Sequence, residues 1–209
     1  MLQQTSEVMY LVGPPGAGKS ALGDHLQTIG YGSHFPVSDL LRQLVPADHG
    51  RAARLGECAD AMVERFGPLI WRELGIEYAG YQEQPHRRVL VNGPRRIREI
   101  DAALNNRVDV LFVDADEQVC AERLAQQAAR TGRAFNETAF LMRSRQERTG
   151  TTSGGKHGIY VNGIRAMGGL LIVGNNVDIP ALRWADNTRQ NSKLFPQRRI
   201  QMLRRAIGL

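Results

Sequence analysis

The stretch that most constrains the fold is Gly13–Ser20, which reads GPPGAGKS and fits the pattern G-x-x-x-x-G-K-[ST] in full. The apolar run Val8–Val12 precedes it and has the length of a central strand. Glycines at this spacing let successive backbone N–H groups point at phosphate oxygens. In such a loop Lys19 reaches the β- and γ-phosphates of a nucleotide, and the Ser20 hydroxyl binds magnesium. The sequence therefore predicts a strand, a loop that binds ATP, and a helix.

All eight residues of this motif are expected to contact the nucleotide, and Lys19 to take part in catalysis: Gly13, Pro14, Pro15, Gly16, Ala17, Gly18, Lys19 and Ser20. The helix that follows presents its positive N-terminal end to the anion. The motif alone does not separate kinases from GTPases, ATPases and the motor domains of transporters. The segments that follow it narrow this choice.

Three further segments have a clear pattern. Residues 35–45 read FPVSDLLRQLV, which predicts a helix with Ser38 as its N-cap and with Asp39 and Arg42 on one side. Residues 54–74 predict two helices separated at Gly67-Pro68. Residues 89–95 read VLVNGPR, a buried strand that ends in a turn.

In this order the segments resemble the nucleoside monophosphate kinase family, whose adenylate kinases read roughly GPPGSGKGT, STGDLLR, helix-glycine-helix and DGFPR. The stretch NGPRRIREIDAAL also resembles the P-loop kinases related to dephospho-CoA kinase, whose matching segment is closer to DGIR. The resemblance covers roughly residues 8–148. It implies a kinase that uses ATP and Mg²⁺ and whose acceptor is a small phosphorylated molecule.

By matching position, the resemblance gives roles to several charged residues. Arg42 and Arg95 would hold the phosphate of the acceptor, and Asp39 would help to order the acceptor helix. Arg123 would lie over the base or the phosphates of the nucleotide, and Arg130, with Arg133, would belong to a lid. The expected catalytic set is therefore Lys19, Arg95, Arg123 and Arg130. Phosphoryl transfer depends on neutralising and positioning charge, which suits arginine. The alternative for each arginine is a solvated surface charge.

At one position the chain departs from the family. The strand-end Asp that helps to fix magnesium is replaced by the neutral Asn92. Three explanations stay open: Ser20 and the nucleotide phosphates hold the metal, Asp114 or Asp116 at the end of the next strand compensates, or the protein binds nucleotide without transferring phosphate. We expect the metal site to consist of Ser20, Asn92 and Asp114.

The alternation of short apolar strands with helices predicts a three-layer α/β fold of the P-loop NTPase type, with a mostly parallel sheet of about five strands. We expect a kinase domain over residues 1–182. It would contain a helical acceptor-binding insert at about 38–80, and a lid with a mobile glycine-rich loop at about 128–169. Cys58 and Cys120 are expected to be buried thiols.

The net charge of +6 is carried by the last 27 residues, since 183–209 hold seven basic residues and one acid. This segment predicts a basic amphipathic helical tail. It either packs on its own domain or contacts nucleic acid or an acidic partner.

The apolar runs are too short to span a bilayer, and the N-terminus leads directly into the loop motif, so we expect a cytoplasmic protein without a membrane contact. The expected activity is phosphoryl transfer from ATP to a nucleoside or deoxynucleoside monophosphate. The alternatives are a kinase that acts on DNA, RNA or a modified base, and a non-catalytic nucleotide-binding module.

Overall fold

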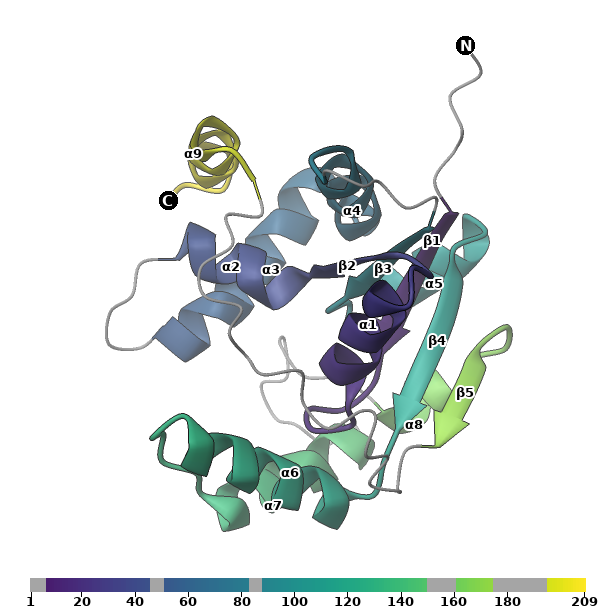
Figure 1. Cartoon of the computed structure of the whole chain (residues 1–209), viewed down its shortest axis with the longest axis vertical. Helices are drawn as coiled ribbons and strands as arrows, with labels where there is room; N and C mark the ends of the chain where they lie inside the picture. The colour runs from purple at the N-terminus through teal and green to yellow at the C-terminus, as the bar shows by residue number, and fades with distance from the viewer. Residues whose placement is uncertain (1–6, 46–50, 83–87, 150–160, 175–194) are drawn as a thin grey trace.

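The structure is a computed structural model, and it describes residues 7–45, 51–82, 88–149, 161–174 and 195–209. Five strands form one all-parallel sheet in the order β2-β3-β1-β4-β5 (Figure 1). They are β1 (Glu7–Val12), β2 (Ser33–Pro36), β3 (Arg88–Asn92), β4 (Asp109–Asp114) and β5 (Leu171–Gly174). The predicted parallel sheet of about five strands is confirmed, and β3 and β4 flank the central strand β1.

Helices connect these strands and cover both faces of the sheet. They are α1 (Lys19–Thr28), α2 (Val37–Leu44), α3 (Arg51–Phe66), α4 (Ile70–Gly80), α5 (Ile97–Asn105), α6 (Glu117–Arg130), α7 (Glu137–Thr149), α8 (Val161–Arg165) and α9 (Gln197–Ala206). None of the helices in the described part of the chain is both long and apolar enough to cross a membrane.

The alternation of side chains along β1 divides the core between two layers of helices. Met9 and Leu11 pack with Leu90 on the face that α1 covers. Tyr10 and Val12 point to the opposite face and belong to the larger core, where α4 contacts β1, β2 and β3. A parallel strand buried on both faces reads as a continuous apolar run, which is the pattern of β1.

The helical insert forms largely as predicted. α3 ends at Phe66 and α4 begins at Ile70, so the break at Gly67-Pro68 is confirmed. The prediction of Ser38 as an N-cap is wrong, because α2 already begins at Val37 and Pro36 occupies the cap position. β2 runs directly into the helix at this point, and Ser38 falls within its first turn.

Part of the expected glycine-rich loop is a helix. Residues 150–160, which include Lys156 and His157, lie outside the described residues. Residues 161–165 form α8, whose Val161 and Ile164 are buried in the larger core. Two apolar side chains three positions apart face the same way on a helix, and their burial explains why this short segment is ordered despite the glycines around it.

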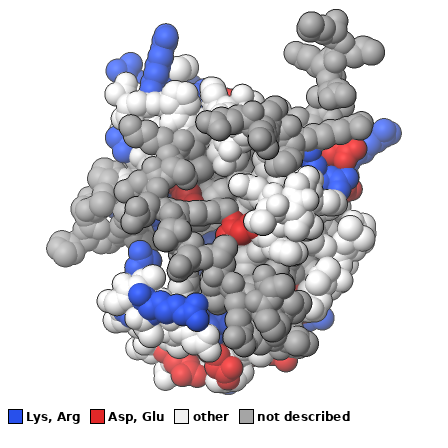
Figure 2. Space-filling model, viewed as in Figure 1, with Lys and Arg blue, Asp and Glu red and all other residues white. Residues whose placement is uncertain are grey.

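The described part of the C-terminal tail is integrated into the domain. Phe195 is buried against Phe35 and Tyr78, with ring centroids 6.0 and 6.3 Å away. Arg199 forms an ion pair with Glu77 of α4 at 2.6 Å. Basic side chains project over α9 in Figure 2. The helical prediction is confirmed for Gln197–Ala206, and residues 183–194 lie outside the described residues.

Candidate active site

The loop that joins β1 to α1 (Gly13–Gly18, the β1–α1 loop) has a conformation that only glycines adopt without strain. Gly13, Gly16 and Gly18 have φ values of 146°, 82° and 97°. A Cβ on Gly13 would lie 2.0 Å from the carbonyl oxygen of Val113 in β4. A Cβ on Gly16 would lie 2.6 Å from the carbonyl oxygen of Cys120 in α6. The loop is therefore held between β4 and α6, and it leads to the first turn of α1, where backbone N–H groups are available to an anion.

The Lys19 ammonium lies across the start of this loop. Its Nζ donates hydrogen bonds to the carbonyl oxygens of Gly13 and Pro14 at 2.9 and 2.8 Å. Burial lowers the pKa of Lys19 to about 7, and the nearby positive charge of Arg95 contributes to the shift. An anion that enters the loop would stabilise the charged form of Lys19 and raise its pKa.

Two of the three expected metal ligands lie together. Asn92 is the last residue of β3, in register with Leu11 of the central strand. Its Nδ2 donates a hydrogen bond to Ser20 Oγ at 3.0 Å, and Asn92 is buried whereas Ser20 is exposed.

The third expected ligand has other neighbours. Asp114 ends β4, and its carboxylate lies 3.3 Å from Arg165 Nη1 and 3.9 Å from Arg148 Nη1. Among the described residues, no three acidic, histidine or cysteine side chains gather as a ready-made metal site. Ser20 and Asn92 are thus the neutral oxygen-bearing groups beside the loop.

Arg95 follows the turn at the end of β3 and belongs to a group of cations. The surrounding protein lowers the pKa of its guanidinium, although the side chain keeps solvent exposure. Glu147 of α7 opposes this shift, and the positive charges of Arg143 and Arg42 add to it. Because Arg95 also lowers the pKa of Lys19, side chains from β1–α1, β3–α5, α2 and α7 all contribute charge to one region.

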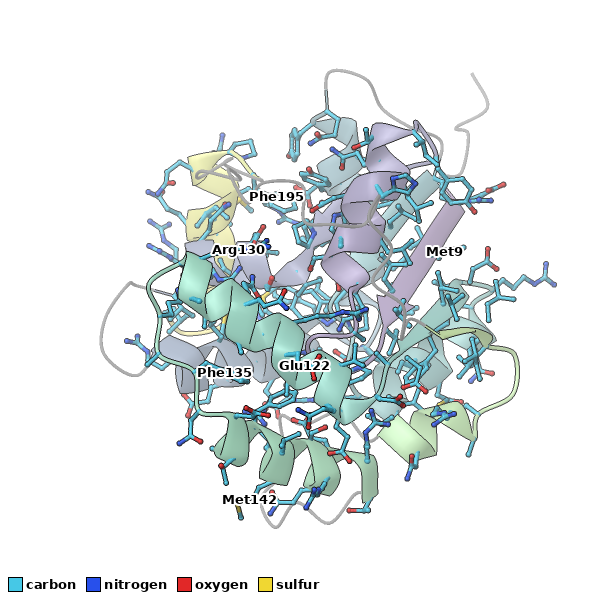
Figure 3. The ribbon with its side chains drawn as sticks, turned by 60° about the horizontal axis from the view of Figure 1, so that its bottom comes forward. Met9, Glu122, Arg130, Phe135, Met142 and Phe195 are labelled. Atoms are coloured by element: carbon cyan, nitrogen blue, oxygen red, sulfur yellow. The ribbon has the colours of Figure 1, made fainter. Side chains whose placement is uncertain are left out.

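Arg123 projects from α6 onto the β1–α1 loop. Its Nη1 lies 3.5 Å from the carbonyl oxygen of Gly16, and the side chain is half-buried. Arg130 is the last residue of the same helix, about 10 Å further along its axis, and is exposed there (Figure 3). Arg133 is exposed beyond the helix end. Of the three arginines, Arg123 is the one in contact with the loop.

Asp39 and Arg42 form an ion pair one turn apart on α2, and both side chains keep access to solvent. Their helix packs against α3, β3 and α9. Arg204 of α9 holds the C-terminal end of α2, donating from Nε to Leu44 O at 2.9 Å and from Nη2 to Gln43 O at 2.7 Å. The C-terminal helix thereby fixes the helix that carries Arg42.

Two buried carboxylates near the site were not singled out from the sequence. Glu147 on α7 accepts a hydrogen bond from Arg143 Nε at 2.8 Å and is 5% exposed. Glu99 on α5 is 4% exposed and accepts three hydrogen bonds. A sequence signal existed for Glu99, since it lies three residues after the N-cap Arg96, at the spacing of a capping box. We find no comparable signal for Glu147.

Comparison with known proteins indicates a fold but not a family. No family model matches the sequence, and no curated protein matches it. Among solved structures the chain is similar to the crystal structure of TT1252 from Thermus thermophilus, with a TM-score of 0.52 and 20% identity. That match covers 84% of this chain and 92% of the other. At this identity the likeness shows an α/β fold with a parallel five-stranded sheet and nothing about activity.

Proposed function

We propose that this protein is a kinase of the P-loop NTPase type that transfers the γ-phosphate of ATP to a small phosphorylated acceptor. The first candidate for the acceptor is a nucleoside or deoxynucleoside monophosphate. The observation that carries the proposal is the convergence of Lys19 and Arg95 from separate elements. Their mutual repulsion, added to burial, lowers the pKa of Lys19 to about 7. A phosphate between them would remove that repulsion, which is the arrangement that phosphoryl transfer requires.

Each side of the site has its own role in this proposal. The β1–α1 loop and Lys19 bind the β- and γ-phosphates, and Arg123 on α6 neutralises charge above the loop. Arg95 binds the phosphate of the acceptor, and Arg42, oriented by Asp39, binds it from α2. These roles bring the two phosphates toward one another and balance their charge, so the contribution of the chain is positioning and electrostatic.

The implied Mg²⁺ fits the residues beside the loop. The Ser20 hydroxyl is a neutral oxygen ligand of the kind that Mg²⁺ prefers, and its oxygen accepts a hydrogen bond from Asn92 Nδ2. Magnesium would neutralise phosphate charge, and with no carboxylate in this pair the phosphates themselves would supply the negative ligands. Ser20 is the residue that would hold it, with Asn92 orienting the hydroxyl.

The test uses magnesium and γ-labelled ATP with a panel of ribo- and deoxyribonucleoside monophosphates, dephospho-CoA, and single- and double-stranded oligonucleotides. Label that moves to one small acceptor supports the proposal and identifies the substrate. A Lys19→Met variant should then lose transfer, whereas Arg205→Ala, an exposed change on α9, should retain it. Label that moves to oligonucleotides alone would refute a small acceptor.

A second candidate function is favoured by Asn92. Because position 92 carries no acidic side chain, the protein would bind ATP without transferring phosphate. It would then act as a nucleotide-binding module whose contacts with a partner depend on bound ATP. The same panel separates the two functions. Tight ATP binding without transfer to any acceptor supports the module, and transfer to any of them excludes it.

A further inference from the structure

The carboxylate of Glu99 connects two segments that are distant in the sequence. Its Oε2 accepts hydrogen bonds from the backbone N–H groups of Arg95 and Arg96, at 2.9 and 2.8 Å. Its Oε1 accepts a hydrogen bond from the indole N–H of Trp71 in α4, at 2.8 Å. Glu99 and Trp71 are 4% and 1% exposed. A helix cap needs only the backbone donors, so the bond to Trp71 is an additional link between α4 and the loop that carries Arg95.

The same loop, Asn92–Arg96, is also in contact with the other two helices of the insert. Arg96 forms an ion pair with Asp60 of α3. Gly93 has a φ of 153°, and a Cβ there would lie 2.5 Å from Cβ of Val37, the first residue of α2. The loop is thus fastened to α2 by close packing, to α3 by an ion pair, and to α4 through Glu99. A displacement of these helices would therefore act directly on the backbone of Arg95.

The bonds of Glu99 have a strict donor and acceptor pattern. All three partners are N–H donors, and an ionised carboxylate supplies acceptors on both of its oxygens. An amide at this position would keep one acceptor oxygen and would turn an NH₂ group toward either the loop or the indole. Because the site is buried, an NH₂ group that faces an N–H donor would lower the free energy of unfolding and would also displace the loop or the indole.

We propose that Glu99 is a positioning residue that couples the helical insert to Arg95, so that closure of the insert on an acceptor and capture of its phosphate by Arg95 occur together. The inference rests on the proposed function, since it takes Arg95 as the group that binds the acceptor's phosphate. Glu99 does not itself touch the substrate. It acts by accepting hydrogen bonds from the N–H groups of the two peptides that flank Arg95.

The first test compares Glu99→Gln with the unmodified protein in steady-state kinetics, using the acceptor that the labelling panel identifies. We expect KM for the acceptor to rise about tenfold to a hundredfold, as for a small misplacement of a binding group, with KM for ATP within about twofold of its original value. Asp101→Asn is the matched control, because it makes the same charge change at an exposed position of α5. Equal losses for ATP and acceptor would overturn the proposal.

A double-mutant cycle separates positioning from general destabilisation. If Glu99 acts through Arg95, then Glu99→Gln added to Arg95→Ala raises the acceptor KM no further. A purely structural role would give additive effects. A second signature tests the link to α4: Trp71→Phe removes the indole donor while Glu99 keeps its bonds to the loop, so Trp71→Phe alone should raise the acceptor KM. Trp71→Phe/Glu99→Gln should then raise it no further than Glu99→Gln does. Additive effects in either cycle, or an unchanged acceptor KM in Trp71→Phe, refute the coupling.

Amide hydrogen exchange tests the same idea without any acceptor. Glu99→Gln should speed exchange in the loop Asn92–Arg96 and in α4, while α1 keeps its protection. If the unmodified protein phosphorylates no member of the panel, the proposed function fails, and the exchange result alone decides the positioning. Unchanged exchange in the loop would overturn it, even if phosphoryl transfer is found.

Discussion

Binding of ATP to this protein should be accompanied by uptake of a proton at Lys19. Burial and the charge of Arg95 hold the pKa of this side chain at about 7 in the free protein. A phosphate beside the ammonium favours the charged form, which returns the pKa toward the ordinary value of about 10.4. Below pH 7 Lys19 is already protonated before ATP arrives, and above pH 7 the proton must be taken from the solvent.

The magnitude follows from these two pKa values. With a pKa of about 7 in the free protein, binding should take up about 0.1 proton at pH 6, about 0.5 at pH 7 and about 0.9 at pH 8. Because protons are taken up on binding, the affinity for ATP also depends on pH. Because the complex holds more protons than the free protein, affinity falls as pH rises above 7, by about fivefold between pH 7 and 8 and by close to a factor of ten per pH unit above pH 8.

Calorimetric titration with magnesium-ATP in two buffers of different ionisation enthalpy measures this uptake directly. Lys19→Arg is the control, since arginine keeps the positive charge but does not titrate in this range, and its uptake should be close to zero. Arg95→Gln should give a smaller uptake than the unmodified protein at pH 8, because it removes the second cause of the lowered pKa. An uptake at pH 8 no larger than at pH 6, or equal in Lys19→Arg, would refute the reasoning.

Three further changes test the architecture around the site. Gly16→Ala and Gly30→Ala both place a side chain at positive φ, which costs about 1–2 kcal/mol each, but only the new methyl group at position 16 would meet the backbone of α6. Urea unfolding should therefore show a larger fall in the free energy of unfolding for Gly16→Ala than for Gly30→Ala. Calorimetry should show that only Gly16→Ala loses ATP binding. Arg204→Ala removes both bonds to the end of α2 and should lower the free energy of unfolding by about 2 kcal/mol, or Tm by about 4–8 °C, whereas the exposed Arg205→Ala should change it by less than about 0.5 kcal/mol. Asn92→Asp should lower the magnesium concentration needed for half-maximal transfer, and an unchanged magnesium dependence would mean that the metal is fixed elsewhere.

The sequence predicted those parts of the molecule that depend on local pattern. The loop glycines, the strand that precedes them and the break at Gly67-Pro68 are each determined by a few adjacent residues, and all three have the expected backbone. The strand order around β1 was also predictable, because parallel strands joined by helices have few arrangements. The pairing of Asn92 with Ser20 follows from that order, since β3 and β1 end at the same edge.

What the sequence did not predict depends on contacts between distant segments. The bond between Trp71 and Glu99 spans 28 positions, and the capping-box spacing of Glu99 points only to the start of its own helix, not to Trp71. The integration of α9 depends on Phe195 reaching Phe35 and Tyr78, which no local periodicity reveals. Ser38 was a reasonable cap by residue type, but the direct entry of β2 into α2 moved the helix start to Val37. Tertiary packing decided each case.

The neutral residue at position 92 is consistent with the charges around it. Lys19 and Arg95 are already close enough for one to lower the pKa of the other, and Asn92 donates its amide hydrogen to Ser20 without adding a charge. An aspartate there would attract Mg²⁺, but it would also offset part of the positive charge that the two cations offer to phosphates. Under the proposed function, the neutral residue would favour attraction of phosphate over fixation of the metal, and the phosphates would hold the ion together with Ser20. Asn92→Asp should therefore reduce the magnesium requirement and, by raising the pKa of Lys19, also reduce the proton uptake that accompanies ATP binding at pH 8.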